Sequence, residues 1–112
     1  MDKTTHIDIG VDFNPALGPR YRRLGPFSGE QFFEDLLDPA YQSSSHIIVH
    51  LDSIKGYSAS FFEEAFGGLV RKYGLSETTT KVSFDAISRR YLIPLIRTWM
   101  EEAESTRNTR TK

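Results

Sequence analysis

The stretch that decides the fold is residues 46–71, HIIVHLDSIKGYSASFFEEAFGGLVR, which has the pattern of a strand followed directly by an amphipathic helix. Residues 46–51 form a short, β-branched apolar run, which favours a strand buried on both faces of a parallel sheet. Ser60, with a glutamate three residues later, has the pattern of a capping box, and Gly74 is a suitable stop for the helix. A strand that leads into a covering helix is the repeating unit of an α/β protein.

The segments on either side continue this alternation of strands and helices. In chain order we expect a strand at 6–13, a loop at 14–25 that can hold a second strand at 21–24, a helix from Ser28 to Asp38-Pro39, a strand at 81–84 and a helix at 85–105. Pro94 either kinks the last helix or begins its regular part, and both possibilities stay open. The order predicts an α/β fold with a mixed sheet of about four strands and three main helices. We expect a single domain over 1–105, followed by a disordered basic tail at 106–112.

Length and composition exclude several classes of protein. The 112 residues suit one domain, and the 38% hydrophobic and 26% charged fractions are those of a globular protein. Lys and Arg number 14 against 15 Asp and Glu, so no net field favours nucleic acid or an anionic membrane. The absence of cysteine excludes disulfides and thiolate chemistry. Without a signal peptide or an apolar run of about 20 residues, we expect a soluble, cytoplasmic protein.

The residues that carry catalysis or bind metals do not form a recognisable site. His46 and His50 lie on one expected strand roughly 13 Å apart, too far to share one ion, and His6 stands alone. The chain has no nucleophile elbow and no glycine-rich phosphate loop. Glu63 and Glu64 are neighbours, which places them about 100° apart on a helix. We therefore expect no enzyme activity, no metal and no cofactor.

A basic cluster precedes the first expected helix. Arg20, Arg22 and Arg23 stand shortly before Ser28, the predicted cap of that helix. Arginines beside a helix N-terminus are suited to bind a phosphate or an acidic surface. The other interpretation is an ordinary solvated loop, and a role in nucleic-acid binding would rest on these few charges and the tail.

The helix after the central strand carries two unusual features. Gly67 and Gly68 lie on its polar side and cost about 1 kcal/mol each relative to alanine, which indicates that something approaches the backbone closely. Either a neighbouring element of the fold or a partner protein can fill that role. Ser58 and Ser60 stand at the start of this helix, where a phosphate would meet open amides and the positive end of the dipole. The simpler interpretation is that Ser60 only caps the helix.

Four motifs together resemble a known bacterial family. They are GPRY at 18–21, GPFSGEQF at 25–32, LDP at 37–39 and GYSASFFEEAFGGLVR at 56–71. Over about residues 6–97 the chain resembles the family described as a STAS-like domain of unknown function. That family is similar in fold to the STAS domain of anti-sigma factor antagonists, which implies a STAS-like small sandwich.

The resemblance also implies a mode of regulation. In the antagonists, a kinase-like anti-sigma factor phosphorylates a serine at the start of the helix after the central strand, and the phosphate breaks the complex. The equivalent position here is Ser60, with Ser58 as its neighbour. The antagonists carry an Asp-Ser-Ser-Gly signature at this point, whereas this chain has YSASFF at 57–62.

These features lead to one hypothesis and one alternative. We expect a bacterial signalling module that binds another protein, such as a kinase-like ATPase or another regulator, and that phosphorylation of Ser60 or Ser58 switches. The predicted partner-binding residues are Gly56, Tyr57, Glu63, Glu64, Gly67, Gly68 and Arg71. The alternative is an anion- or nucleic-acid-binding module that uses Arg20, Arg22, Arg23 and Ser28. We do not expect nucleic acid or a membrane as the main partner, and the oligomeric state stays open.

Overall fold

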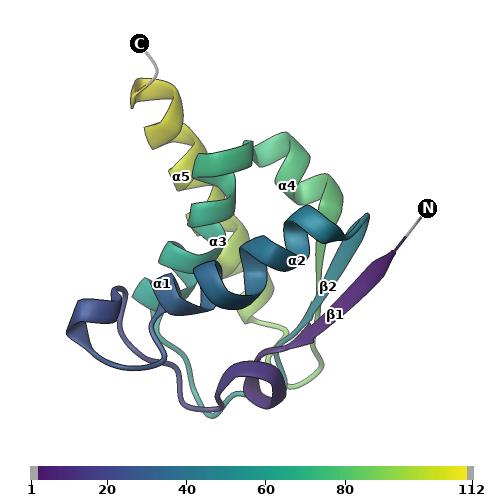
Figure 1. Cartoon of the computed structure of the whole chain (residues 1–112), viewed down its shortest axis with the longest axis vertical. Helices are drawn as coiled ribbons and strands as arrows, with labels where there is room; N and C mark the ends of the chain where they lie inside the picture. The colour runs from purple at the N-terminus through teal and green to yellow at the C-terminus, as the bar shows by residue number, and fades with distance from the viewer. Residues whose placement is uncertain (1–2, 111–112) are drawn as a thin grey trace.

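Three parallel strands in the spatial order β1-β2-β3 form the sheet of the computed structural model, which describes residues 3–110 (Figure 1). The strands are β1 (Thr4–Asp8), β2 (His46–His50) and β3 (Val82–Asp85). Val49 of the central strand pairs with Ile7 on one side and with Phe84 on the other. The α/β class is therefore confirmed. Within residues 3–110, however, the sheet has three strands instead of about four and is entirely parallel instead of mixed.

Helices fill both connections between the strands and follow the last strand. The first connection contains α1 (Gly29–Phe32), a π-helical turn (Phe33–Leu37) and α2 (Asp38–Ser43), which run on without a break. The second contains α3 (Ala59–Tyr73) and α4 (Leu75–Lys81), and α5 (Leu92–Arg110) follows β3. None of the helices within residues 3–110 is long and apolar enough to cross a membrane.

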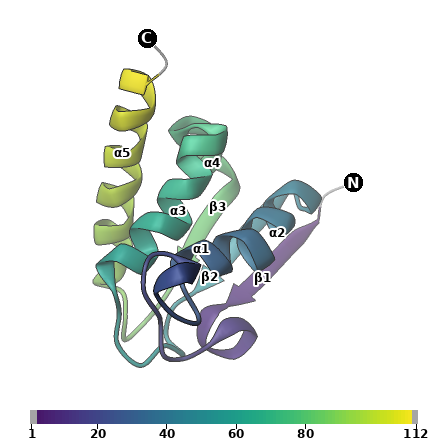
Figure 2. The ribbon, with the colours of Figure 1, turned by 60° about the vertical axis from the view of Figure 1, so that its left-hand side comes forward.

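The helices pack on one face of the sheet, with α3 between the first helical segment and α5 (Figure 2). Ile47 and Val49 of β2 are fully buried against them, together with four phenylalanines that pack between α1, α3, α5 and the sheet. The phenylalanines are Phe32, Phe61, Phe62 and Phe66. This core explains why the apolar face of α3 is broad.

The other face of the sheet is only half covered. His46, Ile48 and His50 alternate with the buried residues of β2 and keep part of their surface exposed. The prediction that β2 is buried on both faces was therefore wrong. A short apolar run in a small sheet does not reveal whether one or two layers of helix cover it.

Two strand predictions in the first connection were also wrong. Residues Ile9–Phe13 form a π-helical turn instead of extending β1, and Arg22–Leu24 form a 3-10 turn. Pairing of β1 ends at Asp8 because β2 leaves the sheet after its partner His50. Beyond that point the backbone N–H of Gly10 donates to the Ser53 hydroxyl at 2.8 Å. Residues after β1 are therefore bonded to the loop that follows β2 and not to a strand.

Two prolines explain where the helix boundaries differ from those predicted. The first helix passes through Pro39 because the π-helical turn ends at Leu37 and a new α-helical segment begins at Asp38. This restart places Pro39 in a first turn, where no N–H bond is required. Pro94 likewise lies in the first turn of α5, so it begins that helix and does not kink it. The helix then continues to Arg110, so residues 106–110 of the expected disordered tail are helical, and residues 111–112 lie outside the described part.

Candidate interaction site at the start of helix α3

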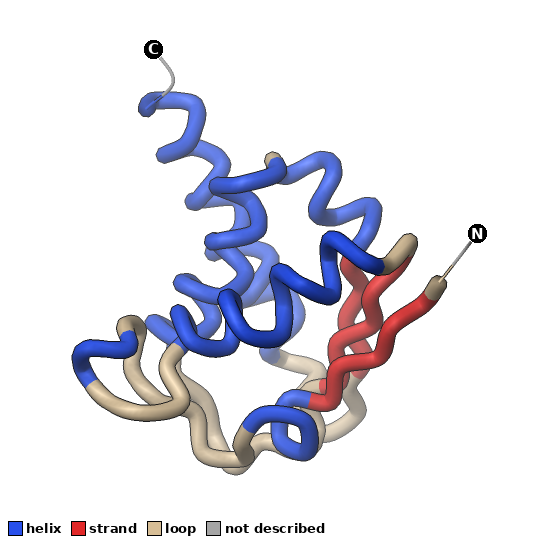
Figure 3. Tube along the Cα trace, in the orientation of Figure 1, coloured by secondary structure: helices blue, strands red, loops and turns tan. Residues whose placement is uncertain are grey.

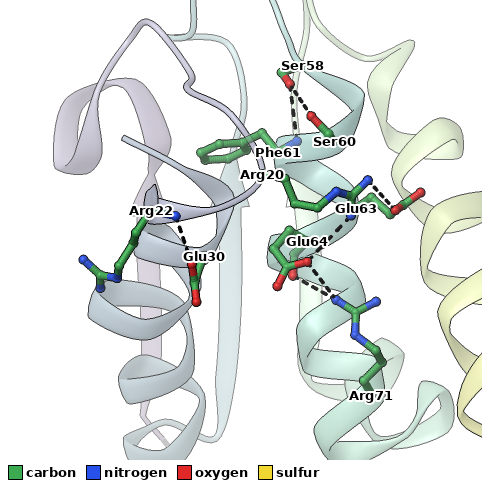
Figure 4. A network of polar contacts seen from close by, with 9 residues as sticks. All are labelled: Arg20, Arg22, Glu30, Ser58, Ser60, Phe61, Glu63, Glu64 and Arg71. Carbon is green, nitrogen blue, oxygen red and sulfur yellow. Dashed lines mark hydrogen bonds and ion pairs between the residues drawn. The ribbon is translucent and has the colours of Figure 1, made fainter. Parts of the chain in front are cut away.

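Ser58, and not Ser60, is the residue that caps α3. Its hydroxyl accepts a hydrogen bond from the backbone N–H of Phe61 at 3.3 Å, the contact that defines an N-cap. Ser60 is the second residue of the helix, and its hydroxyl lies 3.1 Å from that of Ser58 (Figure 4). The predicted capping box of Ser60 and Glu63 is therefore wrong by two positions. Both serines keep part of their surface exposed.

The start of α3 has backbone donors that the chain does not use. Within residues 3–110 the N–H groups of Ala59 and Ser60 have no hydrogen-bond acceptor. They stand at the N-terminus of a 15-residue helix, where the aligned peptide dipoles give a partial positive charge. An acceptor brought by another molecule can therefore bind here.

The loop before α3 is held in place by the loop between β3 and α5. The Asp52 carboxylate accepts hydrogen bonds from Ile87 N at 2.7 Å, Arg89 N at 2.9 Å and Ser88 Oγ at 3.0 Å. Backbone hydrogen bonds, first from Arg89 and then from Ile87, lower the pKa of Asp52. These loops gather at the end of the sheet where the three strands finish (Figure 3). These hydrogen bonds hold in place the loop that leads into α3.

An ion-pair network lies on the outer surface of α3. Arg20 Nη2 is 2.6 Å from Glu63 Oε1, and Arg20 Nη1 is 3.6 Å from Glu64 Oε1. Arg71 Nη2 is 3.4 Å from the same Glu64 oxygen (Figure 4). Three predicted partner-binding residues and one predicted anion-binding residue therefore form one cluster. The sequence offered no sign of this, because Arg20 stands 43 positions before Glu63.

The arginine cluster is largely neutralised. Arg22 Nε is 2.9 Å from Glu34 and its Nη2 is 2.7 Å from Asp35, and the hydrogen bonds that Arg22 donates to these carboxylates raise its pKa. Arg20 is paired with α3. Of these three arginines only Arg23 forms no ion pair within residues 3–110, and its guanidinium lies 5.3 Å from the centre of the Tyr21 ring. The three arginines therefore do not converge on one open anion site.

The N-terminus of α1 is closed to a ligand. Ser28 is fully buried, and its hydroxyl accepts from Gln31 N at 3.0 Å, so the predicted cap is confirmed. The N–H groups of Gly29 and Glu30 donate to the carbonyls of Pro19 and Arg20, both at 2.9 Å. Ser28 is therefore a structural cap with no free donor beside it.

The glycine pair serves packing inside the fold. A Cβ on Gly67 would meet the Arg71 guanidinium at 2.9 Å and Ala103 of α5 at 3.4 Å. A Cβ on Gly68 would lie 3.0 Å from the Phe33 ring. Of the two possibilities that the sequence left open, the structure supports close approach by neighbouring elements. Among the other predicted contact residues, Gly56 has open space around it and Tyr57 is 48% exposed.

A polar chain that the sequence did not predict crosses the open face of the sheet. A hydrogen bond of 2.9 Å joins His6 Nδ1 to His50 Nε2, and His50 Nδ1 lies 3.0 Å from Asp85 Oδ2. The parallel register brings the isolated His6 beside His50, which spacing along the chain could not show. No group of three potential metal ligands occurs among residues 3–110. These side-chain hydrogen bonds therefore link all three strands of the sheet.

The fold and this site define a small α/β domain with an accessible helix N-terminus beyond the central strand. The chain belongs to the family described as a STAS-like domain of unknown function, which matches residues 28–89. This range runs from the α1 cap to the turn before α5 and includes the start of α3. No curated protein and no solved structure matches the chain.

Proposed function

We propose that this protein is a regulatory protein-interaction module that acts by binding a partner and not by catalysis. The observation that carries the proposal is the start of α3, where two unused N–H groups and two serine hydroxyls lie together at the surface. Glu63, Glu64 and Arg71 extend this polar surface along the helix. Gly67 and Gly68 are not part of the contact, because they pack against the protein's own side chains.

Phosphorylation of Ser60 is the proposed switch. The Ser58 hydroxyl is engaged in capping, whereas within the described residues the Ser60 hydroxyl contacts only that of Ser58. A phosphate on Ser60 would add about −1.5 to −2 charges beside the positive end of the helix and close to Glu63. In the anti-sigma factor antagonists that the chain resembles, this event releases the partner. We propose the same direction here, with a kinase-like ATPase or another regulator as the partner.

Co-purification of the tagged protein from native cell extract tests the proposal. We expect wild type and Ser60→Ala to capture one protein that Ser60→Glu does not. Ser76→Glu is the matched control, because Ser76 is an exposed serine at the second position of α4. The captured protein is then purified, and its affinity for wild type and for the three variants is measured by titration. A complex that is indifferent to Ser60, or the recovery of nucleic acid alone, would contradict the proposal.

The alternative of an anion- or nucleic-acid-binding loop draws no support from this geometry. Arg20 and Arg22 are paired with carboxylates, Ser28 is buried, and the first amides of α1 are bonded to the chain.

A further inference from the structure

An exposed apolar surface adjoins the start of α3. Tyr57 is 48% exposed and Tyr91 is 49% exposed, and their rings meet edge to face with centroids 6.3 Å apart. Leu95, the fourth residue of α5, is 38% exposed, and Ile87 in the loop before that helix is 79% exposed. We call these four residues the tyrosine surface. Clusters of exposed aromatic and aliphatic side chains mark interaction sites more often than scattered ones do.

The tyrosine surface is ordered before any partner arrives. The Tyr57 ring contacts Phe62 of the core, with centroids 6.5 Å apart. Arg89 donates through Nη1 to the Tyr91 hydroxyl at 3.4 Å and through Nη2 to the Ile54 carbonyl at 3.0 Å. The three bonds to Asp52 hold the loop that carries Arg89. Binding here therefore costs little conformational entropy in this chain.

Basic residues without a counter-ion in the described chain stand next to the two tyrosines in the sequence, and the Arg89 guanidinium contacts the Tyr91 hydroxyl. Within residues 3–110, Lys55, Arg89 and Arg90 form no ion pair, whereas Arg20, Arg22 and Arg71 are each paired with a glutamate. The nearby Asp52 carboxylate already accepts three hydrogen bonds from its own chain. The open amides of Ala59 and Ser60 add a partial positive charge two to three residues beyond Tyr57.

We infer that the tyrosine surface binds an acidic segment of the partner protein that also carries apolar side chains. The apolar side chains would cover the two tyrosines, and the carboxylates would reach Lys55, Arg89 and the open amides of α3. Tyrosine and arginine are enriched at the centres of protein interfaces, and complementary charge selects the partner. This inference rests on the proposed function and names the chemistry of its partner. It also explains why a phosphate on Ser60 would repel that partner.

A defined peptide tests the inference without the natural partner. The probe is a fluorescent synthetic peptide of about twelve residues that alternates glutamate with leucine and phenylalanine. Matched peptides carry glutamine or lysine in place of glutamate. Binding is measured by fluorescence anisotropy, and its position by the amide chemical shifts of the isotope-labelled protein. We expect the acidic peptide alone to bind, with shifts centred on Tyr57, Arg89 and Tyr91.

Two variants and one control locate the contact. Lys55→Gln with Arg89→Gln, and separately Tyr57→Ser with Tyr91→Ser, should each weaken binding roughly fivefold or more. Lys3→Gln with Arg23→Gln removes the same charge elsewhere and should leave the affinity within about twofold. Chemical shifts far from the substitutions confirm that each variant is folded.

The inference is overturned if the lysine peptide binds as well, if no peptide binds, or if the shifts map to residues 20–23. A nucleic-acid oligomer or anionic vesicle that binds the tyrosine surface more tightly than the acidic peptide would also overturn it. Loss of peptide binding with a Ser60-dependent protein complex intact would leave the proposed function standing and refute only this surface. Peptide binding at the tyrosine surface without any Ser60-dependent complex would support this surface and refute the proposed switch.

Discussion

The N-termini of α1 and α3 look alike in sequence and differ in what they expose. Each helix begins with a serine whose hydroxyl accepts from the N–H three residues later, at 3.0 Å for Ser28 and 3.3 Å for Ser58. Ser28 is fully buried, and the next N–H groups donate to the carbonyls of Pro19 and Arg20. Ser58 is part-exposed, and the next two N–H groups of α3 have no acceptor within residues 3–110.

The difference shows that a capping motif locates the start of a helix but does not show whether the N–H groups there are free to bind another molecule. A serine cap satisfies one of the four orphan N–H groups of a helix. Whether the others stay open depends on which distant carbonyl packs against them. At α1 the loop 14–25 provides those carbonyls, and at α3 no segment within residues 3–110 does.

The largest effect is expected from a methyl group added at the closed helix start. A Cβ on Gly29 would lie 2.5 Å from the Phe61 carbonyl oxygen of α3, a backbone atom that cannot move alone. Gly29→Ala should therefore lower the free energy of unfolding by about 3 kcal/mol or more, as measured by urea titration. Gly68→Ala is the control, since its close neighbour is the Phe33 ring, which can shift. Equal losses in the two variants would mean that α1 and α3 are not in tight backbone contact.

Removing each serine cap compares the closed start of α1 with the open start of α3, with a smaller expected effect. Ser28→Ala should cost about 2 kcal/mol of unfolding free energy, because it leaves a buried N–H without an acceptor. Ser58→Ala should cost about 0.5–1 kcal/mol, since water can replace the lost hydroxyl at the part-exposed helix start. Paired urea titrations measure both, and a larger loss at Ser58 would reverse the comparison.

Acid should loosen the loop before α3 and leave the start of α1 unchanged. The pKa of Asp52 in the folded protein is below its ordinary value of 3.8, so its stabilising effect is present above that value and is lost as the pH falls through the folded pKa. The contacts at α1 use main-chain carbonyls, which do not titrate. Amide hydrogen exchange, corrected for intrinsic rates, should show lower protection of Ile87 and Arg89 at about pH 3 than at pH 7. Asp52→Asn is the control and should show little further change with pH.

The smallest effect is expected from a negative charge at the open helix start. Ser60→Asp places a carboxylate near the dipole of α3 and should raise the unfolding free energy by about 0.5 kcal/mol at low salt, partly offset by Glu63. Thermal unfolding in low and high salt measures the difference, which should shrink as salt is added. A loss of more than about 1 kcal/mol would show that this helix start is not open to an anion.

The elements with the clearest periodicity were predicted well from sequence. The strand at 46–50 and the helix at 59–73 lie where the pattern placed them, within a residue or two. The errors fall where tertiary contacts override local preference. Residues 9–13 alternate like a strand, yet they leave the sheet because β2 no longer runs beside them.

The candidate site was predicted in position but not in detail. The sequence placed Ser58 and Ser60 at the start of a helix after the central strand, as the structure has them. It could not show that Arg20 pairs with Glu63, that Phe33 rests on Gly68, or that His6 meets His50. Each of these contacts joins residues that are far apart in the chain.

Local sequence was enough for the Ser28 cap, the main periodic elements and the α/β class, because these depend on residues a few positions apart. The family also followed from motifs that can be read along the chain. Only the tertiary structure decided which backbone amides have no acceptor and which arginines are paired with carboxylates. It also decided which glycines are packed against neighbouring side chains. The physical reason is that a polar group is free or satisfied according to what packs against it, and here the neighbours come from other loops and helices.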